Sequence, residues 1–558
     1  MSSAEPNVIS PGDPGKGPMD STMGKSHLGN VRLRHHETNE IILVPTPSKD
    51  PNDPLNWSTA YRRYVATLVS IAIFMSNFLA AGVSVAIVEI AADLLGAVGP
   101  GLSSGIAKAS YLLTVSALLQ GLGNLFWMPL IVKFGRRPVY IASFLMYTVT
   151  AAWAGAAKSF ASSLAARALM GFASGSAETL APLTISDIFF LHERGRIMAI
   201  YTAALGAGSS GGIILSGLIT INLSWRYIYW VAVPIIGACT VLMFFTFPET
   251  EYKRAKTTDA FLPASGSDSG RSPTGDMKDV TEASYLEDQT QPPNGQLIPP
   301  KKTYRQTLSL YSGVYTKESF FKLVMRPIFL LALPPVLWAT LVMSVSIGFL
   351  VAVSSNFASA FATHYGFLAY QSGLCYGAAL VGALLGVFFG GTFSDKIADF
   401  FTRQNGGIRE AEMRLPALVL GNITMPLALL LYGFGISKGM HWIVPTLGLG
   451  IYNFALVQAT NITLVYTIDS FRPVAGEVVV TQFVFKSAFG FLLSFYLNPW
   501  IEKSGYEAAF GTMAAICFFT LAFWIVFFTW GTRIKYWSWH WGFIKRVAHW
   551  SEDREVGE

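Results

Sequence analysis

Long uninterrupted apolar runs are the feature of this chain that most restricts its fold. Three clear examples are 64–88, 139–157 and 514–530, and an α-helix needs about 20 mostly apolar residues to cross a bilayer. Charged residues make up 13% of the 558 residues, against about 25% in soluble domains. The chain is therefore expected to be an all-α membrane protein.

Twelve such runs are expected, six in each half of the chain. They are 64–88, 107–131, 138–157, 163–190, 197–219, 226–247, 327–352, 370–393, 415–436, 441–466, 477–499 and 507–530. The stretch 257–300 is rich in Ser, Asp, Gly, Thr and Pro, a composition that cannot bury enough apolar area to fold. The expected organisation is a disordered tail at 1–60, a six-helix bundle at 61–250, a largely disordered linker at 251–326, a second six-helix bundle at 327–532 and a tail at 533–558.

Basic residues are concentrated in loops on one side of the predicted membrane. That side holds Arg62, Arg63, Lys133, Arg136, Arg137, Arg194, Arg196, Lys396, Arg403, Arg409, Arg414, Arg533 and Lys535. The opposite loops hold little more than Lys108, Lys158, Lys438 and Lys503. Because cytosolic loops carry the excess of Lys and Arg, both termini and the linker are predicted to be cytosolic. The net charge of +6 then reflects topology, and no nucleic-acid partner is expected.

Two short motifs stand at matching places in the two halves. Gly135-Arg136-Arg137 follows the second predicted span, and Gly390-Gly391 with Asp395 follows the eighth. Each is expected to form a tight turn, for which glycine has the required backbone freedom. The recurrence predicts a chain built from a repeat, which is typical of proteins that move a solute across a membrane.

Six plus six spans, with the Gly-Arg-Arg-Pro turn at 135–138 and its counterpart at 390–396, resemble the major facilitator superfamily. The segment 53–58 resembles the fungal twelve-span drug:proton antiporter branch. The segments 124–129 and 405–415 are similar to the fungal histidinol and polyamine transporter group. The resemblance implies two pseudo-symmetric six-helix bundles, alternating access, no cofactor, and a place in the fungal plasma membrane.

The first turn departs from the family pattern. Met128 stands where the family has glycine and Val132 where it has an acid, whereas the second motif keeps Gly391 and Asp395. We expect Asp187 at the end of the fourth span, with Arg194 after it, to serve the cytosolic gate together with Asp395. The alternative is that Arg136, Arg137 and Arg194 simply anchor their loops at the membrane surface.

Glu178 is the most informative single side chain, because it lies near the middle of the fourth span. A charge there costs roughly 2.5–3.5 kcal/mol on insertion scales, so it normally faces the bundle interior. Arg167 is about 16 Å away along the helix, too far to neutralise it. The predicted function is a carboxylate at which a proton and a cationic substrate exclude each other. The alternative is a Glu that an unseen partner holds for packing.

Lys486 is the second charge inside a span, at a depth similar to that of Glu178. It could pair with Glu178 or extend to a membrane interface. Asn77, Asn453, Gln458 and Asn461 are amides within spans, and each could contact substrate or bond to a neighbouring helix.

Enzyme motifs are missing from the sequence: there is no His-Glu-x-x-His, no Walker loop and no Gly-x-Ser-x-Gly in a suitable context. No metal and no cofactor are expected. The leading prediction is a monomeric, proton-coupled secondary transporter of small organic cations resembling polyamines. Segment 208–212 lacks the proline of the family's export signature, so transport direction stays open. A multidrug exporter and a nutrient sensor that moves no solute are the alternatives.

Overall fold

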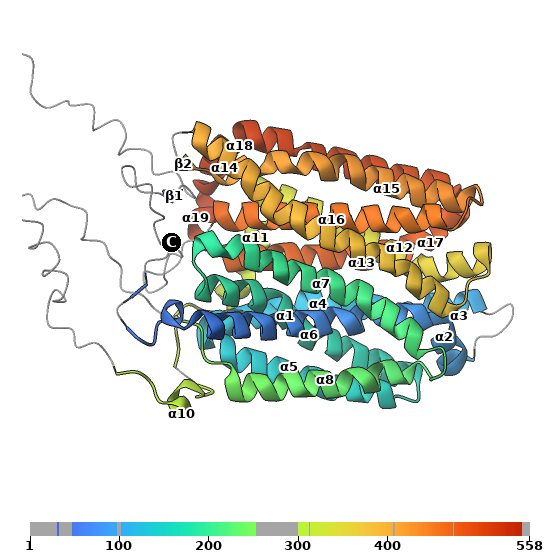
Figure 1. Ribbon diagram of the computed structural model, residues 1–558, viewed down its shortest axis with the longest axis horizontal. Coiled ribbons are helices and arrows are strands. Elements are labelled where there is room, and N and C mark those ends of the chain that lie inside the picture. Colours follow the sequence, from blue (N-terminus) through green and yellow to red (C-terminus); the bar gives the residue numbers. More distant parts are fainter. Residues whose placement is uncertain are drawn as a thin grey trace, which may run out of the picture.

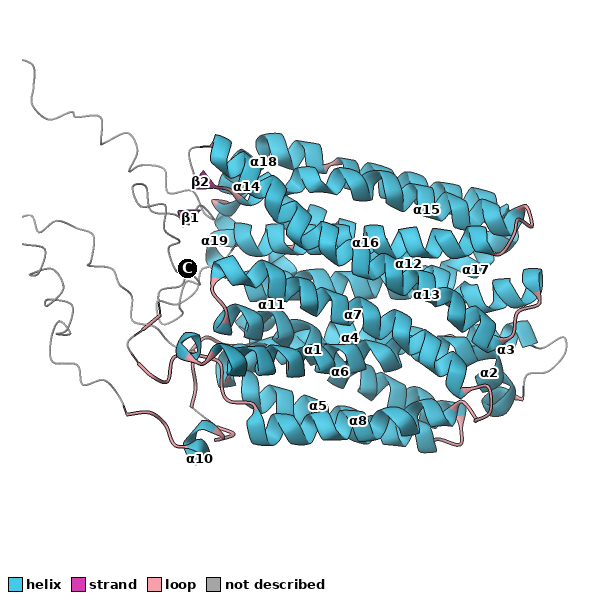
Figure 2. Ribbon diagram, viewed as in Figure 1, coloured by secondary structure: helices cyan, strands magenta, loops and turns pink. Residues whose placement is uncertain are grey.

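Helices make up almost all of the described chain, and most of them run along one common axis (Figures 1 and 2). The computed structural model describes residues 31–32, 47–48, 50–96, 102–252, 300–311, 313–405, 408–471 and 474–548. Loops gather at the two ends of the bundle. We call the end that carries α10, α14 and α19 the basic end, and the end that carries α2 and α3 the opposite end.

The first half comprises the described residues before 253. Its elements are β1 (Val31–Arg32), η1 (Pro54–Asn56), α1 (Thr59–Gly82), η2 (Val83–Ala86), α2 (Ile87–Leu95), α3 (Leu102–Ala109), α4 (Tyr111–Phe134), α5 (Arg136–Ala156), α6 (Phe160–Ile188), α7 (Leu191–Ile219) and α8 (Arg226–Thr246).

The second half comprises the described residues from 300 onward. Its elements are α10 (Tyr304–Thr307), α11 (Phe320–Leu330), α12 (Pro334–Tyr365), α13 (Ala369–Phe388), η5 (Phe389–Phe393), α14 (Ser394–Gln404), β2 (Ile408–Arg409), η6 (Ala411–Leu418), α15 (Val419–Ser437), α16 (Ile443–Ser470), α17 (Ala475–Ala522), α18 (Trp524–Trp539) and α19 (Gly542–Ala548).

Eleven helical segments of the described chain are long and apolar enough to cross a bilayer. The twelfth span is α6, which is long enough but carries Arg167, Glu178 and Asp187 among many small residues. Most of its residues are buried inside the protein, so α6 presents little surface to lipid. The twelve predicted spans are therefore present as two six-helix bundles.

The same helix pairs recur in the two halves. In the first half α4 packs on α6, α1 on α7, and α5 on both α6 and α8. The corresponding contacts in the second half are α13 on α16, α12 on α17, and α15 on both α16 and α17. Because the helices occupy equivalent positions in the order of spans, the packing confirms the predicted internal repeat.

The two halves meet along two helix pairs, α4 with α17 and α7 with α13. Gly121 of α4 faces the side chain of Ser487 of α17, with no room for a Cβ between them. At the basic end the Tyr315 N–H donates a hydrogen bond to the carbonyl of Lys133 across the halves, at 3.0 Å. The interface is thus closely packed at more than one depth.

One boundary differs from the sequence-based expectation, and another agrees with it. The seventh span begins at Pro334 rather than at 327, because α11 forms a separate helix that ends at Leu330. The eleventh and twelfth spans are divided at Gly505, whose φ of 76° interrupts α17. Prolines suit the first turn of a helix, and a positive φ suits glycine, so both boundaries have local causes.

A short strand pair connects segments that are distant in sequence. β1 pairs antiparallel with β2, with Val31 opposite Arg409 and Arg32 opposite Ile408. β1 precedes the first span, whereas β2 lies between the eighth and ninth. The chain before the first bundle is therefore bonded to a loop of the second bundle at the basic end (Figure 1).

Candidate functional site

A buried ion pair joins the two halves, with Glu178 on α6 and Lys486 on α17. Lys486 Nζ donates a hydrogen bond to Glu178 Oε1 at 3.1 Å and also lies 3.1 Å from Oε2. Glu178 is 3% exposed and Lys486 is 6% exposed. The structure therefore pairs Lys486 with Glu178 and does not extend it toward a membrane interface.

Side chains from three other helices of the first half contact Glu178 directly or through one another. Gln120 of α4 donates a hydrogen bond from Nε2 to Glu178 Oε1 at 3.2 Å, and its Nε2 also lies 3.4 Å from Ser76 Oγ of α1. The Tyr201 hydroxyl of α7 donates to the backbone carbonyl of Glu178 at 3.3 Å. Gln120 is itself buried, so its hydrogen bond orients the carboxylate from within the first half.

The Lys486 ammonium also lies over an aromatic ring. Its Nζ is 4.4 Å from the centroid of Phe483, which lies one turn earlier on α17. A cation over an aromatic face is attracted by the ring quadrupole, more strongly where water is excluded. Phe483 is buried, so this contact further stabilises the ammonium in its position.

Arg167 has a different environment from Glu178, although both lie on α6. Its guanidinium donates to the carbonyls of Leu112 at 3.0 Å, Leu79 at 2.7 Å and Ala80 at 3.4 Å. Those carbonyls belong to α4 and α1, and Arg167 is fully buried. Arg167 thus ties three helices together, in agreement with its predicted separation from Glu178.

Three of the four predicted amides donate hydrogen bonds to backbone carbonyls and not to the ion pair. Asn77 and Asn453 each donate to the carbonyl four residues earlier in their own helix, at 3.0 Å. Gln458 of α16 donates to the carbonyl of Ala417 at 2.7 Å, and Asn461 is buried on the same helix. Their contact with substrate stays a prediction.

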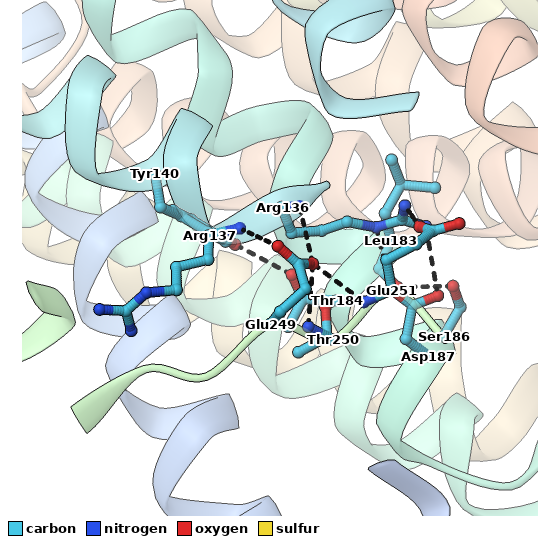
Figure 3. Close-up of polar contacts among 10 residues, drawn as sticks. All are labelled: Arg136, Arg137, Tyr140, Leu183, Thr184, Ser186, Asp187, Glu249, Thr250 and Glu251. Carbon is cyan, nitrogen blue, oxygen red and sulfur yellow. Dashed lines mark hydrogen bonds and ion pairs between the residues drawn. The ribbon is translucent and has the colours of Figure 1, made fainter. Parts of the chain in front are cut away.

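The first turn carries a polar cluster, shown in Figure 3. Gly135 has a φ of 93°, so the predicted tight turn between α4 and α5 is present. Arg136 Nε lies 3.1 Å from Asp187 Oδ2 at the end of α6, and the Arg136 guanidinium also pairs with Glu251. Asp187 therefore contacts the first turn, and its predicted role in a cytosolic gate stays a prediction.

Glu249, in the segment after α8, supplies a carboxylate that the first turn lacks at Val132. Its two oxygens accept hydrogen bonds from the backbone N–H groups of Arg136 at 2.9 Å and Arg137 at 3.1 Å (Figure 3). These groups begin α5, where a helix favours negative charge. Burial raises the pKa of the Glu249 carboxyl, and the two N–H bonds and the Arg136 charge act against that rise.

The second motif binds its acid to two arginines of the same half. Arg414 Nη2 lies 2.5 Å from Asp395 Oδ1, and Arg409 Nη2 lies 3.3 Å from the same oxygen. Arg409 also pairs with Asp399 at 3.2 Å. Like the Arg136 cluster, this cluster joins helix ends within one half.

The prediction of a tight turn at Gly391 is wrong. The chain continues from α13 through the π-helical segment η5 into α14, so it stays helical as far as Gln404. The Ser394 hydroxyl donates to the carbonyls of Gly390 at 2.6 Å and Gly391 at 2.9 Å. That side chain bonds to carbonyls of the wider π turn, which the sequence pattern did not indicate.

One predicted site residue has not yet been placed, and three residues of the site were not among those predicted. Arg194 lies on α7 at a position whose side chain is outside the described residues. Gln120, Phe483 and Glu249 were not predicted. Gln120 carries the same signal as the four amides, a polar group within a span, whereas a phenylalanine in a span gives no signal at all.

Comparison with known proteins agrees with this architecture. The model of the Major Facilitator Superfamily matches residues 69–479. An uncharacterized MFS-type transporter of Schizosaccharomyces pombe is 26% identical over 529 residues, covering 89% of each chain. Protein HOL1 of Saccharomyces cerevisiae is 25% identical over 546 residues, covering 90% of this chain and 91% of its own. The proton:xylose symporter XylE from E. coli superimposes with a TM-score of 0.58 at 12% identity, covering 85% of this chain and 97% of XylE. With the family model covering most of the sequence and the fold shared, this chain belongs to the Major Facilitator Superfamily and is a multi-pass membrane transporter.

Proposed function

We propose that this protein is a proton-coupled secondary active transporter of small organic cations, working by alternating access in the fungal plasma membrane. The observation that carries the proposal is the buried ion pair between Glu178 and Lys486, which joins one half to the other. Both termini would be cytosolic, as the distribution of basic loops favours.

The pair can couple a ligand to movement of the halves. Alternating access requires the helices of one bundle to move relative to the other, and α6 and α17 belong to different bundles. Removing one partner of a buried ion pair leaves an uncompensated charge, at a cost of several kcal/mol. A cationic substrate or a proton on Glu178 would replace the charge of Lys486, so either ligand can release the pair.

The substrate class is supported by charge and by resemblance. A carboxylate is the natural partner of an ammonium group, and the segments 124–129 and 405–415 resemble the histidinol and polyamine transporter group. The relative HOL1 matches nearly the whole chain. Polyamine-like cations are therefore the first substrates to test.

Radiolabelled spermidine uptake tests the proposal in cells that lack their own uptake system. We expect accumulation that varies with external pH in the wild type, and loss of that pH dependence in Glu178→Gln, because the amide cannot exchange a proton. Glu502→Gln, an exposed carboxylate at the opposite end, is the matched control. Unchanged pH dependence in Glu178→Gln would refute the role of Glu178.

An exporter is the second candidate. The family's export signature contains a proline, and the corresponding segment of α7, Gly208 to Gly212, has none. Gly208 and Gly212 pack on the α1 carbonyls of Phe74 and Phe78. Depletion of spermidine below the level of control cells would support export. A nutrient sensor would instead show normal signalling and no flux in proteoliposomes.

A further inference from the structure

We propose that the Lys486 ammonium occupies the place of the substrate's own ammonium, so that Lys486 is a tethered competitor for Glu178. Phe483 and Gln120 are then the specificity-determining residues. This inference rests on the proposed function and makes it more specific: the ligand is a primary ammonium on an unbranched alkyl chain.

The argument starts from what surrounds Lys486 Nζ. Two sides are formed by the carboxylate oxygens of Glu178, each at 3.1 Å. A third side is the face of Phe483, with its centroid 4.4 Å away. The acceptor oxygen Oε1 is fixed by Gln120, whose own position is set by Ser76. Together these groups form what we call the ammonium cage: Glu178, Phe483 and Gln120.

The residues around the ammonium come from both halves, and this explains why Lys486 can compete with a free cation. Glu178 and Gln120 belong to the first half, whereas Lys486 and Phe483 belong to α17 of the second half. The lysine side chain can leave the cage by a rotamer change, and Glu178, Gln120 and the Phe483 ring then remain in place. A free cation of the same chemistry can occupy the vacated position.

The shape of the current occupant indicates the ligand class. A lysine side chain is a four-carbon unbranched chain that ends in an ammonium with three N–H donors. The carboxylate oxygens at 3.1 Å require a donor that approaches closely. A quaternary ammonium has no N–H and is wider, so it cannot bond to Glu178 in the same way.

The energetic consequence is a reduced apparent affinity in the wild type. When a site is available in a fraction of the molecules, the apparent Kd rises by the inverse of that fraction. If the ion pair is closed in about nine molecules of ten, removal of the lysine should lower the apparent Kd about tenfold.

Binding is measured on the purified full chain in detergent at pH 8, by the dose-dependent rise of the thermal unfolding midpoint. The probes are n-butylammonium, tetramethylammonium and the neutral n-butanol, at constant ionic strength. In the wild type we expect stabilisation by n-butylammonium, and a much smaller response to tetramethylammonium and n-butanol. Equal responses to the two cations would overturn the inference, and this comparison needs no variant.

Lys486→Met tests the tethered competitor directly. We expect n-butylammonium to bind about tenfold more tightly than in the wild type, because the methionine side chain keeps an unbranched apolar stem and has no ammonium. An unchanged or weaker Kd overturns the inference. If Lys486→Met does not fold, Lys486→Gln is measured in its place, and the wild-type probe comparison decides in any case.

Phe483 is tested in the Lys486→Met background, so that the effect on the ligand is separated from the effect on the lysine. Adding Phe483→Leu should weaken n-butylammonium several-fold through loss of the aromatic face. Phe489→Leu, the same change on the same helix, is the control. An equal effect of the two substitutions overturns the role of Phe483.

The two proposals fail separately. If spermidine uptake depends on Glu178 while Lys486→Met binds n-butylammonium no better than the wild type, the tethered competitor is wrong and the transport proposal stands. If no organic cation is transported but the ammonium cage binds n-butylammonium as expected, the transport proposal is wrong and the site assignment stands.

Discussion

Two charged residues lie deep in α6, and the structure gives them different partners. Glu178 pairs with a charge from the other half, whereas Arg167 is bonded to backbone carbonyls of α1 and α4. Hydrogen bonds from a charged donor contribute roughly 1.5–3 kcal/mol each. Arg167 is therefore expected to stabilise the first half, and Glu178 to serve the transport cycle.

Substitution of Arg167 by Lys tests that division. A lysine has no planar fork and cannot reach three separate carbonyls in the same geometry. We expect a loss of about 2–4 kcal/mol, seen as a thermal midpoint several degrees lower in detergent. Arg63→Lys, at an exposed position on α1, should leave the midpoint unchanged. Equal midpoints for the Arg167 variant and the wild type would contradict the role.

Sequence reasoning singled out two of the charged residues whose burial is expensive. Glu178 and Lys486 stand out because a charge within an apolar run needs a partner, and the partner each has is the other. Gln120 carries only the general signal of an amide within a span, and Phe483 carries none. Their importance depends on the packing of α4 against α6 and on the helical turn between Phe483 and Lys486, which only the three-dimensional arrangement supplies.

At the scale of elements, α6 approaches α4 through small residues. A Cβ on Gly171 would collide with the carbonyl of Ser116, and one on Gly175 with the carbonyl of Gln120. Such close approach of helix backbones is typical of packing within membranes. It also places Gln120 beside Glu178, so the packing of two helices sets the geometry of the site.

Gly175→Ala should separate α6 from α4 at the level of Gln120. Overpacking of this kind costs typically about 1–3 kcal/mol, and the shift of Gln120 should also reduce spermidine uptake. Gly377→Ala on α13, where a Cβ meets open space, is the control. Uptake and thermal midpoint are measured together, and wild-type values for both in Gly175→Ala would show that the contact is not needed.

Eleven of the twelve spans followed from apolar runs, because lipid leaves a spanning segment little choice but a helix. The interruptions were harder to predict. α11 is amphipathic and half outside the long apolar run, and η5 is a π-helical segment whose carbonyls accept hydrogen bonds from Ser394. Neither produces a pattern that a count of apolar residues detects.

At the scale of the whole molecule, the Arg136 and Asp395 ion-pair clusters at the basic end each lie within one half, whereas a contact between the halves near that end is made by aromatic rings. Phe126 of α4 contacts Phe320 of α11 across the halves, with ring centroids 6.2 Å apart. The same ring contacts Phe172 of α6 within its own half, at 5.5 Å. Phe126 thus contacts one residue of the other half and one residue of its own half.

Cross-linking at Phe126 tests whether the halves separate at the basic end. With cysteines at Phe126 and Phe320, a short bismaleimide should abolish spermidine uptake, because the halves can no longer move apart. With cysteines at Phe126 and Phe172, the same reagent should leave uptake near that of the untreated pair. Full uptake by the cross-linked inter-half pair would rule out separation at this end.

The unusual composition of α6 has a consequence for how the protein is made. Charged and small residues give this helix too little affinity for lipid to enter the bilayer by itself, at the costs that charged groups incur on insertion. Its carbonyl-bound arginine and its tight fit to α4 supply partners that are already synthesised when α6 leaves the ribosome. Membrane insertion of the fourth span is therefore expected to depend on the helices before it, so a substitution in α1 or α4 can fail in biogenesis before it affects transport.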